Sequence, residues 1–90
     1  MNLLQSPYFM RSYKKLLRNQ LPAVNEAIEQ IISDPQYGEE KKGDLSGIKV
    51  FKFPVGNQMC LLAYESAEDN IYLHALGVHE NFYRDLKRNR

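Results

Sequence analysis

The sequence is poor in the residues that build covalent and metal cross-links. It has one cysteine, Cys60, and two histidines, His74 and His79. A lone cysteine cannot form an intramolecular disulfide, which is typical of reduced, intracellular proteins. The spacing of these three residues offers no structural zinc site. We therefore expect a cytoplasmic protein without a metal or another cofactor.

Long hydrophobic runs are also missing. No stretch approaches the roughly 18 consecutive apolar residues that cross a membrane. The first residues lack the charged segment and apolar segment of a secretory signal, so we expect neither export nor a membrane partner.

A strong net charge is absent as well, since the formal net charge is only +1. This value argues against a strongly basic nucleic-acid-binding protein. The cations are nevertheless grouped at two places, which is enough to form a local basic patch. The two groups are Arg11, Lys14, Lys15 and Arg18, and Arg84, Lys87, Arg88 and Arg90.

What is present indicates one small globular domain spanning residues 1–90. The chain is 43% hydrophobic and 26% charged, close to the average of folded proteins. Ninety residues can enclose a single core of modest stability.

The first third of the chain predicts two helices. Ser6 and Pro7 suit the cap and the first position of a helix, and Pro22 separates that helix from the next. Residues 33–35 end the second helix. Two helices joined by a short turn form an α-hairpin. The apolar positions with helical spacing are Phe9, Tyr13, Leu16 and Leu17, then Val24, Ala27, Ile28, Ile31 and Ile32.

The rest of the chain predicts strands. Residues 36–47 are polar and read as a surface loop, whereas residues 48–53, 58–64 and 71–76 are rich in strand-forming residues. Short turns between these segments favour an antiparallel meander. With the α-hairpin buried against one face of this sheet, the fold class is α+β. Residues 2–5 are either an edge strand or a lead-in.

The segment after the last strand holds the main candidate site. If Gly77 ends the strand and a helix follows, His79 and Tyr83 share one helical face, with Lys87 above them. The alternative is a short C-terminal helix that packs on the sheet through Phe82, Tyr83 and Leu86.

The chemistry of this segment suits a phosphodiester. A histidine can act as an acid or a base near neutral pH, while lysines can stabilise charge on the phosphate. Strand alternation sends Lys49 and Lys52 to opposite faces, so at most one of them joins His79; we select Lys52. We expect His74 to be a packed or surface histidine.

Three segments, in this order, resemble toxins of the RelE/ParE superfamily from bacterial type II toxin–antitoxin modules. Residues 6–16 look like the family's Ser-x-x-Phe-x-Arg-x-x-Lys-Lys-Leu opening, and residues 43–47 look like its Gly-Asp-Leu-x-Gly loop. Residues 61–64 match an apolar strand that ends in tyrosine. The resemblance covers the whole chain and implies the RelE/ParE-like fold.

Within the superfamily, Gly77-Val78-His79 followed by Tyr83 looks most like the YafQ-type ribonucleases. That branch implies catalytic roles for His79, Tyr83 and Lys52. Two arginines of ribonuclease members are missing, because residues 59–62 contain none and Ala75 stands before the Gly-x-His motif.

The resemblance thus implies a metal-independent mRNA endoribonuclease that acts on the ribosome and is neutralised by a cognate antitoxin. The missing arginines leave open a ParE-type inhibitor of DNA gyrase, or a toxin fold that only binds. The residues expected to contact RNA are Lys49, Arg84, Lys87 and Arg88.

Overall fold

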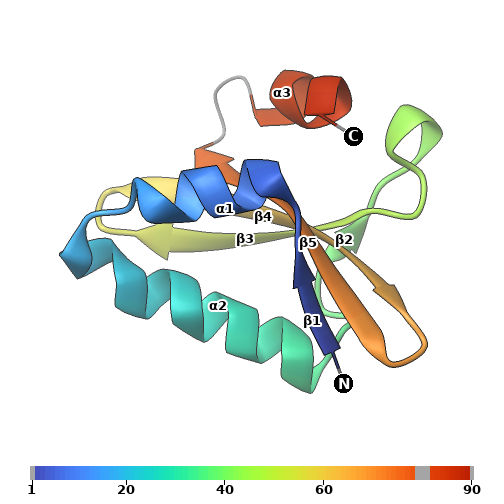
Figure 1. Cartoon of the computed structure of the whole chain (residues 1–90), viewed down its shortest axis with the longest axis horizontal. Helices are drawn as coiled ribbons and strands as arrows, with labels where there is room; N and C mark the ends of the chain where they lie inside the picture. The colour runs from blue at the N-terminus through green and yellow to red at the C-terminus, as the bar shows by residue number, and fades with distance from the viewer. Residues whose placement is uncertain (1, 79–81, 90) are drawn as a thin grey trace.

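The computed structural model describes residues 2–78 and 82–89. Five strands form one sheet in the order β1-β5-β4-β3-β2, with α1 and α2 over one face and α3 over the other (Figure 1). The predicted α+β fold class, with two helices against one face of an antiparallel meander, is thereby confirmed. The elements are β1 (Asn2–Gln5), α1 (Pro7–Lys14), η1 (Arg18–Gln20), α2 (Leu21–Ser33), β2 (Glu39–Glu40), η2 (Gly43–Leu45), β3 (Lys49–Val55), β4 (Gln58–Ala67), β5 (Asn70–Val78) and α3 (Phe82–Asn89).

The meander predicted from the alternating pattern is confirmed. Strands β3, β4 and β5 pair antiparallel in sequence order. Two-residue turns join them, at positions 56–57 and 68–69. Gly56 has φ 61°, a left-handed conformation that suits glycine and that tight hairpin turns require.

The outer strands correct the sequence-based picture. The segment 2–5 is an edge strand, but it pairs parallel to β5, with Leu3 opposite Ile71, so the sheet is mixed. The segment 36–47 is not only a loop, because β2 pairs with β3 and Leu45 is 5% exposed. Both features depend on contacts with distant strands, which the local pattern does not reveal.

Helices α1 and α2 cover the first face. Ser6 caps α1 by accepting a hydrogen bond from the Phe9 amide at 2.9 Å, and its hydroxyl donates to the His74 carbonyl at 2.7 Å. α1 ends at Lys14, earlier than expected, and Leu17 is 64% exposed. The Leu17 amide instead donates to the Gln20 side chain at 2.8 Å and begins η1.

Helix α3 covers part of the second face. Phe82 and Leu86 are buried against Ala63 and Ala75, whose small side chains leave room for the helix. The sequence suggested that Gly77 ends the strand, but β5 continues to Val78. The described part of α3 begins at Phe82. None of the described helices is long and apolar enough to span a membrane.

Candidate functional site

Polar side chains of helix α3 contact the segment that follows β2. The Lys41 ammonium lies 5.0 Å from the centre of the Tyr83 ring and also pairs with Glu39. One turn later, Lys87 Nζ lies 3.6 Å from Asp44 Oδ2. Tyr83 therefore packs beside the second-face core, with a cation against its ring.

Lys52 lies close to the same group. It is exposed on β3, and strand alternation puts it on the α3 side with Val50. The Lys41 hydrogen bond is the main cause that lowers the pKa of Glu39, and the charge of Lys52 adds to it. The Glu39 hydrogen bond raises the pKa of Lys41, with a further contribution from Tyr83. We call Lys52, Glu39, Lys41 and Tyr83 the cation–phenol cluster.

The structure separates the two lysines predicted on this strand. Lys49 is 9% exposed, lies opposite Tyr64 on the other face and has its ammonium 3.6 Å from Glu40. The opposite directions of Lys49 and Lys52 were expected from alternation. His79, the first-ranked candidate, lies outside the described residues.

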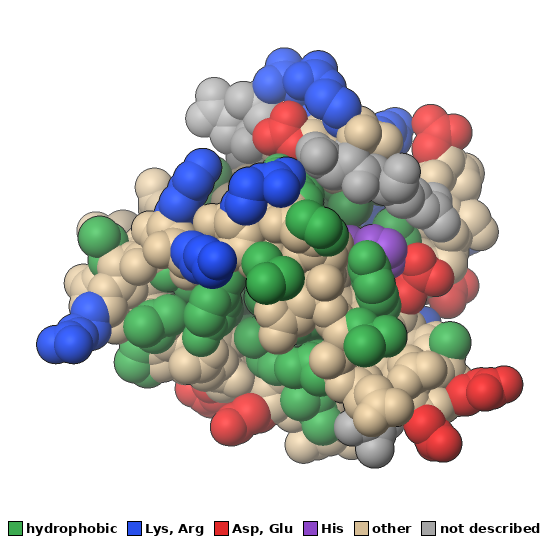
Figure 2. Space-filling view, viewed as in Figure 1, with side chains coloured by type: hydrophobic (Ala, Val, Ile, Leu, Met, Phe, Trp, Pro, Cys, Tyr) green, Lys and Arg blue, Asp and Glu red, His purple; other side chains and the backbone are tan. Residues whose placement is uncertain are grey.

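The remaining predicted RNA-binding residues lie on the outside of α3. Arg84, Lys87 and Arg88 are exposed, and the Arg84 guanidinium lies 3.7 Å from Asp85. Figure 2 shows Lys and Arg side chains over both α1 and α3. The exposed cations of α1, the turn after it and the start of η1 are Arg11, Lys14, Lys15 and Arg18.

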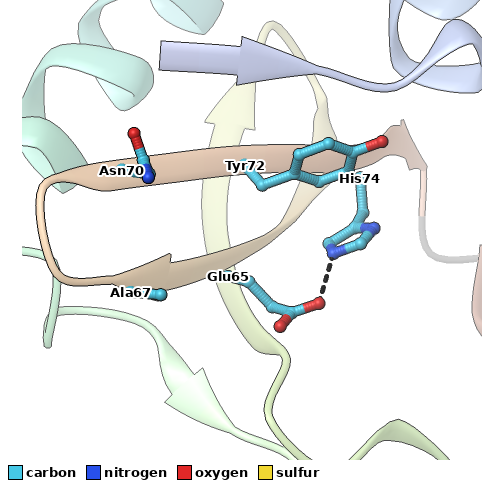
Figure 3. Close-up of a pocket in the computed structure, with 5 residues that line it drawn as sticks. All are labelled: Glu65, Ala67, Asn70, Tyr72 and His74. Atoms are coloured by element: carbon cyan, nitrogen blue, oxygen red, sulfur yellow. Dashed lines mark hydrogen bonds and ion pairs between the residues drawn. The ribbon is translucent and has the colours of Figure 1, made fainter. Parts of the chain in front are cut away.

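A second polar site occupies the far end of the α3 face. A pocket of about 300 Å³ opens between β4 and β5 and is lined by Glu65, Ala67, Asn70, Tyr72 and His74 (Figure 3). His74 Nε2 is 2.7 Å from Glu65 Oε1. The Tyr72 and His74 ring centres are 4.6 Å apart.

A β-bulge places His74 in this pocket. Ala63 pairs with Ala75 whereas Tyr64 pairs with Leu73, which leaves His74 as the extra residue of β5. Bulges redirect a side chain from its regular face. Sequence reasoning set His74 aside because neither the bulge nor its Glu65 partner is visible in a strand pattern.

The described residues show no group of three or more His, Cys, Asp or Glu side chains that could hold a metal ion. Cys60 is buried, and this burial raises the pKa of its thiol, which disfavours the reactive thiolate. Candidate chemistry in the described part of the chain thus lies with imidazole, phenol, carboxylate and lysine groups.

Comparison with known families identifies the fold's relatives. Residues 3–87 match the family described as ParE-like toxin of type II bacterial toxin–antitoxin system. The chain belongs to this family. It is therefore a toxin of the RelE/ParE type, as the motif order predicted, and the family implies an antitoxin partner.

Solved structures agree on the toxin fold. A mutant of the E. coli toxin RelE in the free state has a TM-score of 0.73 at 11% identity, covering 98% of this chain and 90% of that one. A copper-bound mutant toxin from Helicobacter pylori has a TM-score of 0.66 at 21% identity, covering 90% and 97%. A conserved hypothetical protein from Helicobacter pylori has a TM-score of 0.56 at 23% identity, and the match covers 88% of this chain and 94% of that one. No curated protein matches the sequence significantly.

Proposed function

We propose that the toxin is an endoribonuclease that cleaves mRNA on the ribosome without a metal ion. The observation that supports this most is the cation–phenol cluster, in which Lys41 lies over the ring of the α3 tyrosine Tyr83 and Lys52 acts on Glu39, the carboxylate that pairs with Lys41. A phenol from α3, an ammonium group from the segment after β2 and a second one from β3 provide hydrogen bonding and positive charge for a phosphodiester.

The reaction uses the 2′-hydroxyl of RNA as its nucleophile. One group removes the hydroxyl proton while another protonates the leaving 5′-oxygen. His79 takes one of these roles in the proposal, since its segment connects β5 to α3, the helix that contains Tyr83. Lys52 stabilises the charge that builds on the phosphate, and Tyr83 orients it.

In this proposal, the cations around the cation–phenol cluster bind the RNA substrate. Arg84 and Arg88 are exposed on α3, and Lys87 extends the same helix surface. These residues contact the RNA backbone, which attracts cations independently of sequence. Lys49 is buried and paired with Glu40, so it offers RNA little surface.

One observation favours a second candidate, a ParE-type toxin that binds DNA gyrase. Several cations near α3 already have carboxylate partners, namely Lys41 with Glu39 and Lys87 with Asp44. A phosphate must compete with these carboxylates. A toxin that acts by binding a protein has no such requirement.

One experiment decides between the two candidates. The toxin is induced in cells, and the 5′ ends of mRNA are mapped alongside a gyrase cleavage assay. The proposal expects new mRNA ends within translated regions and unaffected gyrase. Growth arrest with gyrase-linked DNA breaks and intact mRNA would replace the ribonuclease proposal with the second candidate.

A further inference from the structure

The pocket between β4 and β5 has polar side chains that hydrogen bonds hold in place. The His74 side chain is 14% exposed and is hydrogen-bonded to the carboxylate of Glu65, whose side chain is 41% exposed. Because a carboxylate only accepts hydrogen bonds, His74 is the donor at 2.7 Å. The Ser6 hydroxyl fixes the His74 backbone from the other side. Figure 3 shows Glu65, Tyr72 and His74 grouped on the hairpin.

The chemistry of the lining selects the ligand. Among the described residues, the lining includes no lysine or arginine, so it offers a phosphate no ammonium or guanidinium group. It combines an aromatic ring from Tyr72, a carboxylate from Glu65 and an amide from Asn70. An aromatic ring stacks on a nucleobase, and carboxylates and amides read the hydrogen-bonding edge of an unpaired base. A volume of about 300 Å³ suits a small, flat group.

We propose that this pocket binds an unpaired nucleobase of RNA, with a preference for guanine. Glu65 presents acceptors only, whereas the Watson–Crick edge of guanine has two adjacent donors, a ring N–H and an amino group. Adenine and cytosine each offer the carboxylate only an amino group beside a ring acceptor. The pocket thus serves as the base-recognition subsite of the ribonuclease, and in this role it rests on the proposed function.

The position of the pocket agrees with this role. Glu65 lies on the same sheet face as Leu61 and Ala63, the face that α3 and Lys52 also occupy. Lys52 is opposite Leu61, four residues along β4 from Glu65, which corresponds to about 13 Å along the strand. Because α3 covers Leu61 and Ala63 between these two points, an RNA strand that passes around α3 can place a base in the pocket and a nearby phosphodiester at Lys52.

Nucleosides test the pocket without involving phosphate contacts. Full-length ¹⁵N-labelled toxin is titrated with guanosine, adenosine, cytidine and uridine, and amide shifts are followed by NMR. Guanosine should shift the amides of residues 65–74 and bind at least about fivefold more tightly than the others, because a single good pair of hydrogen bonds discriminates to this degree or more. Equal binding of all four nucleosides, or shifts elsewhere only, would overturn the proposal.

Variants assign the effect to side chains. Glu65→Gln should abolish the preference for guanosine. Tyr72→Leu should weaken the binding of every nucleoside about tenfold or more, because stacking on the aromatic ring is lost. Glu29→Gln, which changes an exposed carboxylate on α2, is the matched control and should bind like the wild type. If Tyr72→Leu fails to fold, the wild-type titration and Glu65→Gln decide the matter.

Mapping of mRNA ends separates this proposal from the proposed function. The wild-type toxin should show guanine enriched at one fixed position near its cleavage sites, and the mRNA ends that Glu65→Gln produces should lose that enrichment. Guanosine binding without any mRNA cleavage would remove the ribonuclease but leave the pocket assignment standing. Cleavage whose base preference is unchanged in Glu65→Gln would overturn the assignment of the pocket.

Discussion

The hydroxyl of Tyr64 joins the centre of the sheet to the segment that follows α2. It donates to the Pro35 carbonyl and accepts from the Gly38 amide, each at 2.8 Å. A side chain at Gly38 would place its Cβ 2.8 Å from this hydroxyl, so glycine permits the close approach. One residue of the central strand thereby fixes the chain just before β2.

Replacing Tyr64 with phenylalanine should lower the free energy of unfolding by about 1–3 kcal/mol, because two backbone groups lose their partner. Urea unfolding measures the loss. Tyr37→Phe is the control, since Tyr37 is 59% exposed and its substitution should change stability little. An unchanged unfolding midpoint for Tyr64→Phe would mean that these hydrogen bonds contribute nothing net.

The same hydroxyl predicts a pH dependence. Burial raises the pKa of Tyr64 above its ordinary value of 10.0. A raised pKa means that the folded state favours the neutral phenol, so its contribution to stability is complete below pH 10 and is lost as the pH rises further. The stability difference between wild type and Tyr64→Phe should therefore narrow above pH 10. A constant difference would contradict this assignment.

At the proposed catalytic centre, His79→Ala should reduce the rate of mRNA cleavage roughly 100- to 10,000-fold, the usual effect of losing a general acid or base. Antitoxin binding should survive, because the substitution removes none of the core side chains of the described residues. Cleavage in vitro and antitoxin pull-down measure the two effects. A folded variant that cleaves at the wild-type rate would remove His79 from the mechanism.

At the scale of the elements, the apolar residues along one side of α2 are buried to different extents. Ile31 is fully buried between helix and sheet, whereas Ile28 is partly buried at the margin of the same core. The sequence alone gave the two isoleucines equal weight. Their ranking follows only from how α2 lies across β3.

Ile31→Asp should lower the free energy of unfolding by about 3 kcal/mol or more, because it buries an unpaired carboxylate. Ile28→Asp should cost clearly less, since its carboxylate can reach water. Thermal melts of both variants beside the wild type test this order. Equal melting temperatures for the two variants would show that α2 does not pack as described.

Local patterns predicted the elements whose partners are close in sequence. The meander follows from alternation and two-residue turns, and the opposite directions of Lys49 and Lys52 follow from the same alternation. The pattern could not reveal the parallel partner of β1, the pairing of β2 or the extension of β5 through Gly77, because each depends on a distant strand. The pairing of His74 with Glu65 depends in addition on a bulge.

At the scale of the whole molecule, membership in the toxin family predicts a simple phenotype. Induction of this chain alone should stop bacterial growth, and co-expression of the adjacent antitoxin gene should restore it. Colony counts after induction measure both effects, with His79→Ala as the catalytic control. Unaffected growth with verified folded protein would contradict the assignment of toxicity to this chain.

The parallel pairing of β1 with β5 has a consequence for the order in which the molecule forms. Asn2 is hydrogen-bonded to Asp69, and Leu3 lies opposite Ile71, so β1 needs a strand that is synthesised after β2, β3 and β4. During translation from the N-terminus, β1 has no strand partner until β5 has been synthesised. Fragments that end before β5 lack the strand that pairs with both β4 and β1. Synthesis that is interrupted before β5 should therefore yield fragments without the toxin fold, which should not inhibit growth.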